Sequence, residues 1–159
     1  MRKLFITHQA ILIFLLITAA ISCKKNDDPE PDQTKNVTVQ MSGANEVPAV
    51  STTGTGTAQI TYDPVTKMIT YQLVWQLGLA SATTTNMHFH GAEDGSDLKS
   101  SPPTIGITGF STSSSGTLSG TTRALSSTEE TQLLAGKWYV NIHSSTNPGG
   151  ELRGNIKFP

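Results

Sequence analysis

Apolar and polar residues alternate along most of the chain after residue 36. The clearest run covers residues 69–77, where every second residue is large and apolar and Thr70, Gln72 and Gln76 lie between them. A period of two is that of a β-strand with one buried face, because successive side chains of a strand point to opposite sides. This run therefore predicts a strand whose core face carries Ile69, Tyr71, Leu73, Trp75 and Leu77.

The same alternation recurs at 37–41 and 57–62. Asp63-Pro64-Val65-Thr66 separates the second of these segments from the run at 69–77 and has the composition of a hairpin turn. Short strands that recur with turn residues between them predict an all-β protein, an antiparallel β-sandwich or barrel with one face half-solvated. Further strands are expected around 84–90, 105–110, 116–122, 137–143 and 151–158.

One short helix interrupts the strand pattern. Ser127 is the expected N-cap, Glu130 three residues later would complete a capping box, and Gly136 would end the helix. Leu133 and Leu134 provide its apolar side. The helix is expected to connect two strands and to carry no chemistry of its own.

The N-terminal segment has the composition of an export signal. A basic start is followed by an apolar run over residues 10–21, which is too short to span a bilayer but suits a secretory leader. Small residues before Cys23 resemble a bacterial lipobox, which predicts a lipoprotein signal peptide over residues 1–22 and a lipid-modified Cys23. Several acyl chains make a stable anchor, so the partner expected here is a membrane, and the predicted location is the bacterial cell envelope. An ordinary signal peptide with an incidental cysteine is the alternative.

Residues 23–35 are expected to be the lipidated cysteine and a flexible linker, and residues 36–159 a single domain. Cys23 is the only cysteine, so the domain can form neither a disulfide nor a cysteine-based zinc site. Without Arg2 and Lys3, nine basic residues stand against twelve acidic ones, a net charge of −3. This balance predicts no binding of nucleic acid.

Three of the four histidines lie in two predicted strands, where they form the candidate metal site. His88 and His90 share one face of the first strand, and His143 lies on the outward face of the second. If the strands are neighbours, three imidazoles meet on one patch, and three histidines with an open coordination position suit zinc or copper.

A purely structural interpretation of the same region stays open. The polar residues Asn141, Glu151 and Arg153 could form a hydrogen-bonded network with the histidines. In that case Glu151 and Arg153 form an ion pair that holds the turn at Gly149 and Gly150 against the sheet. Both Asn141 and Arg153 are expected on the outward face.

Two stretches of the sequence resemble the CHRD domain, which is named after the developmental regulator chordin. They are residues 136–140, Gly-Lys-Trp-Tyr-Val, and residues 143–154, which end in Asn-Pro-Gly-Gly-Glu-Leu-Arg-Gly. The resemblance covers roughly Asn36 to Phe158. It implies an immunoglobulin-like β-barrel of Greek-key type with a distant likeness to copper/zinc superoxide dismutases, and it implies no settled biochemical activity.

Two classes of function therefore remain open. The linker, the predicted lipid and the absence of a recognisable nucleophile motif favour a noncatalytic binding module with an unidentified macromolecular or small-molecule partner. The histidines favour the alternative, a metalloprotein with copper or zinc at His88, His90 and His143 and a role related to redox chemistry. No catalytic residue is assigned, and enzymatic activity is left undecided, with a noncatalytic role favoured.

Overall fold

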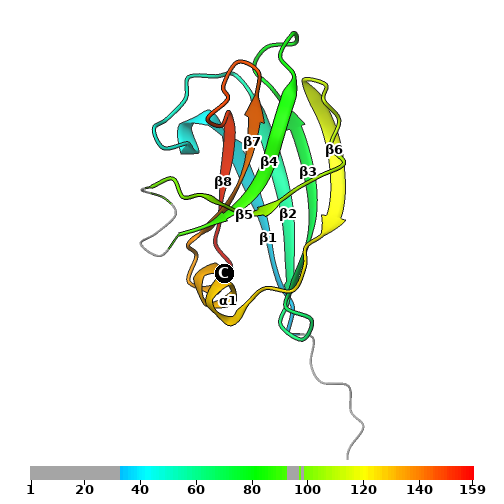
Figure 1. Cartoon of the computed structure of the whole chain (residues 1–159), viewed down its shortest axis with the longest axis vertical. Helices are drawn as coiled ribbons and strands as arrows, with labels where there is room; N and C mark the ends of the chain where they lie inside the picture. Colours follow the sequence, from blue (N-terminus) through cyan, green and yellow to red (C-terminus); the bar gives the residue numbers. More distant parts are fainter. Residues whose placement is uncertain (1–32, 93–96, 98) are drawn as a thin grey trace, which may run out of the picture. The chain divides into compact units, whose positions relative to one another are not determined.

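The alternating segments form eight antiparallel strands in one curled sheet, shown in Figure 1. The computed structural model describes residues 33–92, 97 and 99–159, so the predicted signal peptide, Cys23 and most of the linker lie outside the described residues. The strands are β1 (Lys35–Ser42), β2 (Thr55–Asp63), β3 (Met68–Gln76), β4 (Thr84–Gly91), β5 (Pro103–Gly106), β6 (Ser115–Thr121), β7 (Trp138–Ser144) and β8 (Leu152–Ile156). A 3-10 turn, η1 (Gly43–Asn45), and one helix, α1 (Ser127–Leu134), complete the elements of the described part.

The strand order in the sheet is β5-β4-β7-β8-β1-β2-β3-β6. Neighbours that are far apart in sequence, such as β1 and β8 or β3 and β6, make this more than a simple meander. All pairings are antiparallel, and the sheet curls around an apolar interior, which confirms the all-β expectation. Strands β4, β7 and β8 lie side by side and carry the candidate site.

The hairpin between β2 and β3 forms where the sequence predicts it. Asp63 Oδ1 accepts the backbone N–H of Val65 at 2.8 Å, an Asx-type turn that fixes the local conformation. Lys67 then takes a positive φ of 57°, and the chain returns along β3.

The expected strand at 105–110 is wrong in position, because β5 is Pro103–Gly106. Gly109 has a φ of +83°, a left-handed conformation that turns the chain away from the sheet. β5 is also an edge strand, where Pro103 is tolerated at the start because only one side of the strand is paired.

The N-cap of the helix is one residue earlier than predicted. Ser126, not Ser127, accepts the N–H of Glu129, and the Glu129 carboxylate accepts the N–H of Ser126 at 2.8 Å, so the capping box uses Ser126 and Glu129. Glu130 is engaged elsewhere, because it accepts the Tyr62 hydroxyl at 2.6 Å. That bond ties α1 to β2. Gly136 follows the helix with a φ of +70°, as expected of a residue after its C-terminus.

The expectation of one solvated face fails over the half of the sheet that carries the site. Tyr139, Asn141 and Arg153 lie on the outward face of β7 and β8, yet they are 1%, 3% and 0% exposed. The two connections that cross this face supply Glu46 and Ser101, whose backbone or side chains contact these residues. A period-two pattern reports which face a residue occupies, but it does not report whether a distant loop covers that face.

Candidate functional site

The candidate site lies on the outward face of two paired strands, β4 and β7. Their register places Asn86 opposite His143, His88 opposite Asn141, and His90 opposite Tyr139. Directly opposed residues of an antiparallel pair have side chains on the same face. The register therefore brings all three histidines of the described chain onto one patch.

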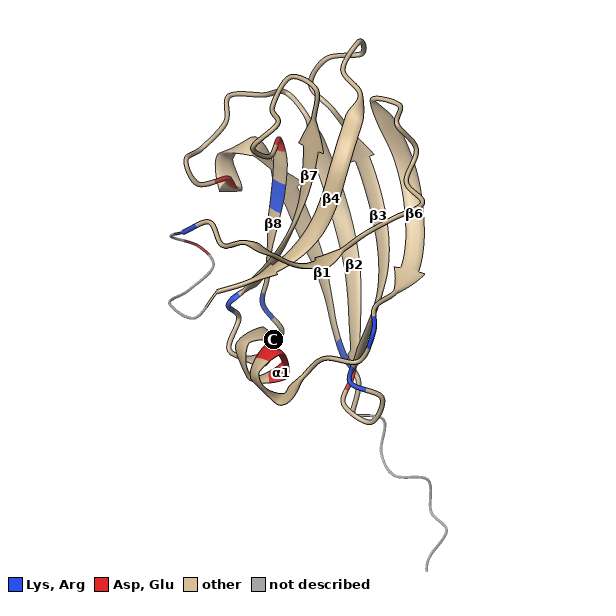
Figure 2. Cartoon of the chain, in the orientation of Figure 1, with Lys and Arg blue, Asp and Glu red and all other residues tan. Residues whose placement is uncertain are grey.

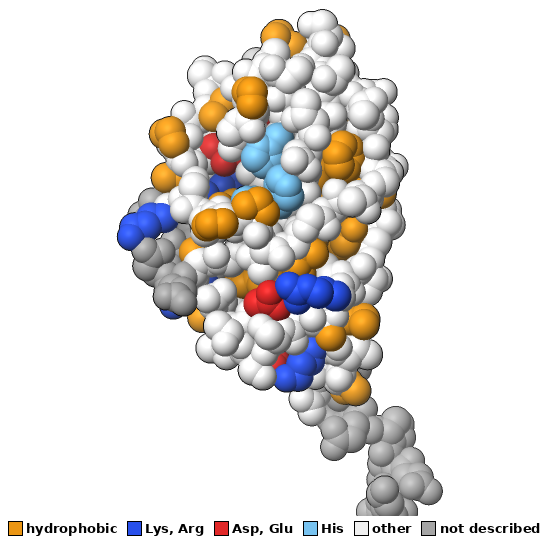
Figure 3. All heavy atoms as spheres, in the orientation of Figure 1, with side chains coloured by type: hydrophobic (Ala, Val, Ile, Leu, Met, Phe, Trp, Pro, Cys, Tyr) orange, Lys and Arg blue, Asp and Glu red, His pale blue; other side chains and the backbone are white. Residues whose placement is uncertain are grey.

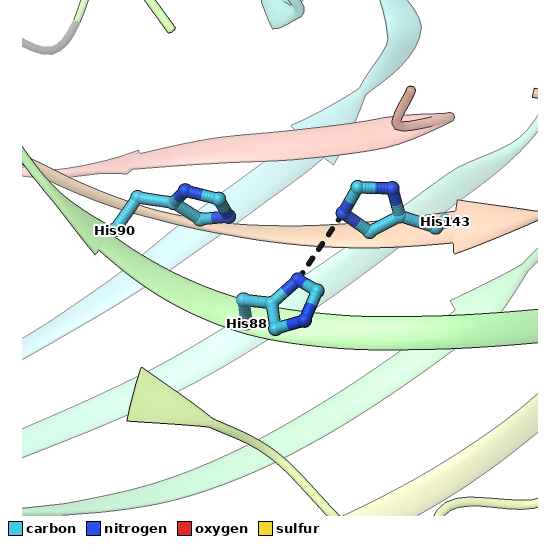
Figure 4. Close-up of side chains that lie close together, drawn as sticks. All are labelled: His88, His90 and His143. Carbon is cyan, nitrogen blue, oxygen red and sulfur yellow. Dashed lines mark hydrogen bonds between the residues drawn. The ribbon is translucent and has the colours of Figure 1, made fainter. Parts of the chain in front are cut away.

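The three imidazoles converge, as Figure 4 shows. One ring nitrogen of each histidine lies within 4.8 Å of the corresponding nitrogen of the other two. His88 Nδ1 and His143 Nε2 are 3.2 Å apart. His88 and His143 are half-buried and His90 is buried, and Figure 3 shows histidine atoms reaching the surface of the domain. The cluster is thus accessible from solvent on one side.

Two backbone carbonyls determine which nitrogens are free. His143 Nδ1 lies 2.8 Å from the carbonyl of Pro148, and His90 Nδ1 lies 2.7 Å from the carbonyl of Ser101. A carbonyl only accepts, so both Nδ1 atoms carry hydrogen and donate. In a neutral ring Nε2 then holds the lone pair, and His143 Nε2 faces His88 Nδ1. His90 Nε2 lies 2.9 Å from Asn141 Oδ1, which only accepts, so a lone pair on His90 Nε2 requires the Asn141 amide to turn and donate through Nδ2.

His88 supplies the proton that occupies the centre of the cluster. Since His143 Nε2 is an acceptor, His88 Nδ1 is the donor of the 3.2 Å hydrogen bond between them. If His88 takes its other tautomer, with the hydrogen on Nε2, its Nδ1 gains a lone pair and the ring releases no proton. Once the Asn141 amide has also turned, three inward-facing lone pairs would be available to a cation.

The environment of His88 and His90 disfavours their charged forms. Burial lowers the pKa of His88, and the neighbouring imidazoles of His143 and His90 lower it further. Burial also lowers the pKa of His90, against the opposing effect of its hydrogen bonds to Ser101 and Asn141. Neutral imidazoles are the form that binds metals.

His90 is held in place by stacking as well as by hydrogen bonds. Its ring lies parallel to that of Tyr139, with centroids 4.5 Å apart and an angle of 6°. The guanidinium of Arg153 covers the Tyr139 ring, 3.5 Å from its centroid. Arg153 Nε donates to Asn155 and Nη2 donates to the carbonyl of Lys99, so the guanidinium is itself positioned. The stack fixes the orientation of the most buried histidine.

Glu46, which interacts with Arg153 and Asn141, was not expected at the site from the sequence. It is 6% exposed, and burial raises its pKa to about 7, although Arg153 and Asn141 pull it downward. Its Oε1 has no hydrogen-bond partner among the described residues. Glu46 precedes the Val47–Pro48 bond in an irregular connection, where no periodicity could have revealed its burial.

Among the polar residues proposed for a structural network, Asn141 and Arg153 lie beside the cluster and Glu151 does not. Asn141 Oδ1 is 2.9 Å from His90 Nε2. Glu151 accepts from Thr52 Oγ1 and from the N–H of Gly78, both at 2.7 Å. Burial raises the pKa of Glu151, but these and other hydrogen bonds outweigh it and lower the pKa overall. The structure gives Glu151 and Arg153 separate partners.

The turn before β8 places Gly150 against the buried carboxyl. Gly150 has a φ of +128°, and a Cβ at this position would lie 2.5 Å from Glu46 Oε1. A side chain would therefore meet both an unfavourable backbone conformation and a close neighbour. Gly149 has open space around the position of a Cβ. The glycine pair thus contains one restricted position and one permissive position.

Comparison with known proteins decides the family. Residues 37–156 match the CHRD domain. The chain belongs to the CHRD domain family. The match begins in β1 and ends with β8, so it includes every strand and all three clustered histidines. No curated protein and no solved structure matches the chain.

Ser101, Pro148 and Tyr139 are functional neighbours that the sequence reasoning did not assign. Ser101 and Pro148 act through backbone carbonyls, which leave no trace in side-chain chemistry. Tyr139 lies two residues before Asn141 on the same face, so the alternation places it near the site, but only the observed register puts it opposite His90.

Proposed function

We propose that this CHRD domain protein is an exported, lipid-anchored binding protein of the bacterial cell envelope, and that its three-histidine cluster binds zinc or copper. The observation that carries the proposal is the convergence of His88, His90 and His143 within 4.8 Å. Cys23 is the predicted lipid attachment point, and the family membership supports a binding or interaction role.

The spacing of the nitrogens suits a first-row metal. Two nitrogens at about 2.0–2.1 Å from a tetrahedral zinc are separated by about 3.3 Å. The nitrogens of His88 and His143 already have that spacing, at 3.2 Å. His90 would have to approach by roughly 1.5 Å to complete three bonds of this length, since the cluster extends to 4.8 Å. Such a shift would require His90 to move away from Asn141.

The hydrogen bonds around the cluster also suit a metal. Ligating histidines commonly donate their second N–H to a backbone carbonyl or a carboxylate, which fixes the ring and its tautomer. Here the carbonyls of Ser101 and Pro148 accept from His90 and His143. When bound, the metal would supply a Lewis-acidic centre with one open position toward solvent.

The surroundings favour binding over catalysis. Among the described residues, the groups that hydrogen-bond to the three imidazoles, apart from the imidazoles themselves, are the backbone carbonyls of Ser101, Pro102 and Pro148 and the amide of Asn141. None of these is a nucleophile or a general base. A protein that holds a metal at this site, or presents it to a partner, is consistent with this set of groups.

Metal binding is tested with the full chain purified without a histidine tag. Zinc or copper should bind at a stoichiometry near one and raise the Tm in proportion to RT ln(1 + [L]/Kd). His90→Ala and His143→Ala should each abolish the metal-dependent rise. Asn86→Ala is the matched control, because Asn86 lies on the same strand face but outside the cluster, and it should keep the rise.

Acid should weaken the binding, because protons compete with the metal for the imidazole lone pairs. Since the pKa values of His88 and His90 lie below the ordinary value of 6.5, the loss should occur at lower pH than for an unperturbed histidine site. If the purified protein contains no metal, its Tm does not change when zinc or copper is added, and His90→Ala lowers its stability, the cluster would instead be purely structural.

A further inference from the structure

A large outward surface of the sheet has no charged residue and lies apart from the histidines. It consists of alternate residues along four adjacent strands: Asn36 to Ser42 on β1, Thr55 to Thr61 on β2, Thr70 to Gln76 on β3 and Ser115 to Thr121 on β6. These sixteen side chains are seven threonines, four glutamines, three serines, Asn36 and Val74, and all are exposed or half-buried. We call this surface the neutral face.

The absence of charge on this surface sets it apart from an ordinary solvated sheet. Solvent-facing positions of a soluble domain typically include many lysine, arginine, glutamate and aspartate side chains. In Figure 2 the middle of β1, β2, β3 and β6 carries no charged residue, whereas charged residues lie at the ends of these strands, on α1, on β8 and in the connections. The charged residues within these strands are Lys35 and Asp63, each at a terminus.

The register arranges the polar groups in rows across the sheet. Gln59 of β2 lies opposite both Thr38 of β1 and Gln72 of β3, and Gln72 lies opposite Ser119 of β6. Strands are about 4.8 Å apart, and alternate residues along a strand are about 6.8 Å apart. Hydroxyl and amide groups therefore recur at nearly even spacing over the whole surface.

Most of these groups are available to a ligand. Within the described chain two side-chain hydrogen bonds cross the face, from Thr61 to Asn36 and between Thr70 and Thr121. Threonine side chains are stiff at χ1, so ordering them on binding costs little entropy. Two shallow hollows open on this face. One, of about 250 Å³, lies over β1 and β2, and the other, of about 270 Å³, lies over β1, β2 and β3.

We propose that the neutral face binds an uncharged polysaccharide. Each hydroxyl and each amide both donates and accepts hydrogen bonds, which matches the hydroxyl groups of a neutral sugar chain. A nucleic acid, an anionic glycan or an anionic bilayer would require basic side chains, which this surface lacks. A protein partner would need a desolvated apolar or aromatic centre. On this side of the four strands the large apolar side chains are Val74 and, at the end of β3, Met68, which lie apart from each other.

The test is co-sedimentation of the full chain with insoluble neutral polysaccharides, namely cellulose, β-1,3-glucan and chitin, and with calcium alginate gel as an anionic comparison. The protein should sediment with at least one neutral polymer and not with alginate. Gln59→Ala combined with Gln72→Ala removes two adjacent amides at the centre of the face and should weaken binding about tenfold. Thr128→Ala, on the exposed side of α1, is the control and should bind as the parent does.

Three outcomes would overturn the proposal. The first is failure of the protein to sediment with any of the three neutral polymers, and the second is equal binding by the double variant and the control. The third is concentration-dependent self-association, measured by analytical ultracentrifugation, that is lost in the double variant. That result would make the neutral face a contact between copies of the chain. Unchanged unfolding curves for the variants exclude loss of the fold, and His90→Ala should leave polysaccharide binding intact.

Discussion

At the scale of single residues, the unusual feature is a buried arginine beside a buried glutamic acid behind the histidines. Arg153 is fully buried, and its guanidinium contacts the Tyr139 ring and donates to oxygens of Asn155 and Lys99. Among the described residues, neither Arg153 Nη1 nor Glu46 Oε1 has a hydrogen-bond partner. Burial of a carboxyl group without enough donors favours its protonated form, in agreement with a pKa of about 7.

Glu46 should therefore make the protein less stable as the pH rises. Its pKa in the folded state, about 7, lies above its ordinary value of 4.5, so the folded state holds the proton more tightly than the unfolded state. The stabilisation is complete below pH 4.5 and is lost as the pH rises to about 7, by up to about 3 kcal/mol.

Glu46→Gln should remove this loss, because glutamine keeps the shape and cannot ionise. Urea unfolding at pH 5 and pH 8 should show the variant gaining much more stability relative to the parent at the higher pH. Asp97→Asn, at an exposed carboxylate, serves as the control. A difference between variant and parent that is equal at both pH values would contradict the prediction.

At the scale of elements, the strands were predictable where the chain alternates and only partly predictable elsewhere. The strands β1, β2 and β3 and the Asp63 turn follow from local pattern and turn chemistry. The burial of Tyr139 and Arg153 does not, because it depends on two distant connections that return over the sheet. The convergence of the histidines required a pairing of β4 with β7, which period-two alternation alone cannot specify.

The cap of α1 shows the same limit on a smaller scale. Ser126 and Ser127 are each followed three residues later by a glutamate, so the sequence pattern fits two registers equally well. Tertiary contacts decide between them: Tyr62 and Lys67 engage Glu130, and Glu129 is left to close the capping box.

The cap register gives a direct prediction. Ser126→Ala should cost about 1 kcal/mol of unfolding free energy, because the N–H of Glu129 loses its acceptor. Ser127→Ala, at the adjacent position inside the helix, should cost much less, since alanine has the higher helix propensity. Chemical denaturation of the two variants measures the difference. Equal losses, or a larger loss for Ser127→Ala, would mean that the helix begins in the other register.

At the scale of the whole molecule, the distance between the domain and its proposed anchor is limited by the chain itself. No helix within the described ranges is long and apolar enough to cross a bilayer. Strand β1 begins at Lys35, so eleven residues separate it from Cys23. Eleven residues reach at most about 40 Å when fully extended. A lipid on Cys23 would keep both the histidine cluster and the neutral face close to the membrane surface.

Cys23→Ala should therefore release the protein from membranes or block its processing, because Cys23 is the only cysteine that could carry the lipid. Fractionation of cells expressing the full chain, followed by detection of the protein in membrane and soluble fractions, measures this. Ser22→Ala, which changes the neighbouring residue and keeps the thiol, is the matched control and should remain with the membrane. Since the three histidines lie on β4 and β7, far along the chain from Cys23, the released variant should keep the metal-dependent rise in Tm. A processed Cys23→Ala protein that still fractionates with membranes would show that attachment depends on something other than the lipid.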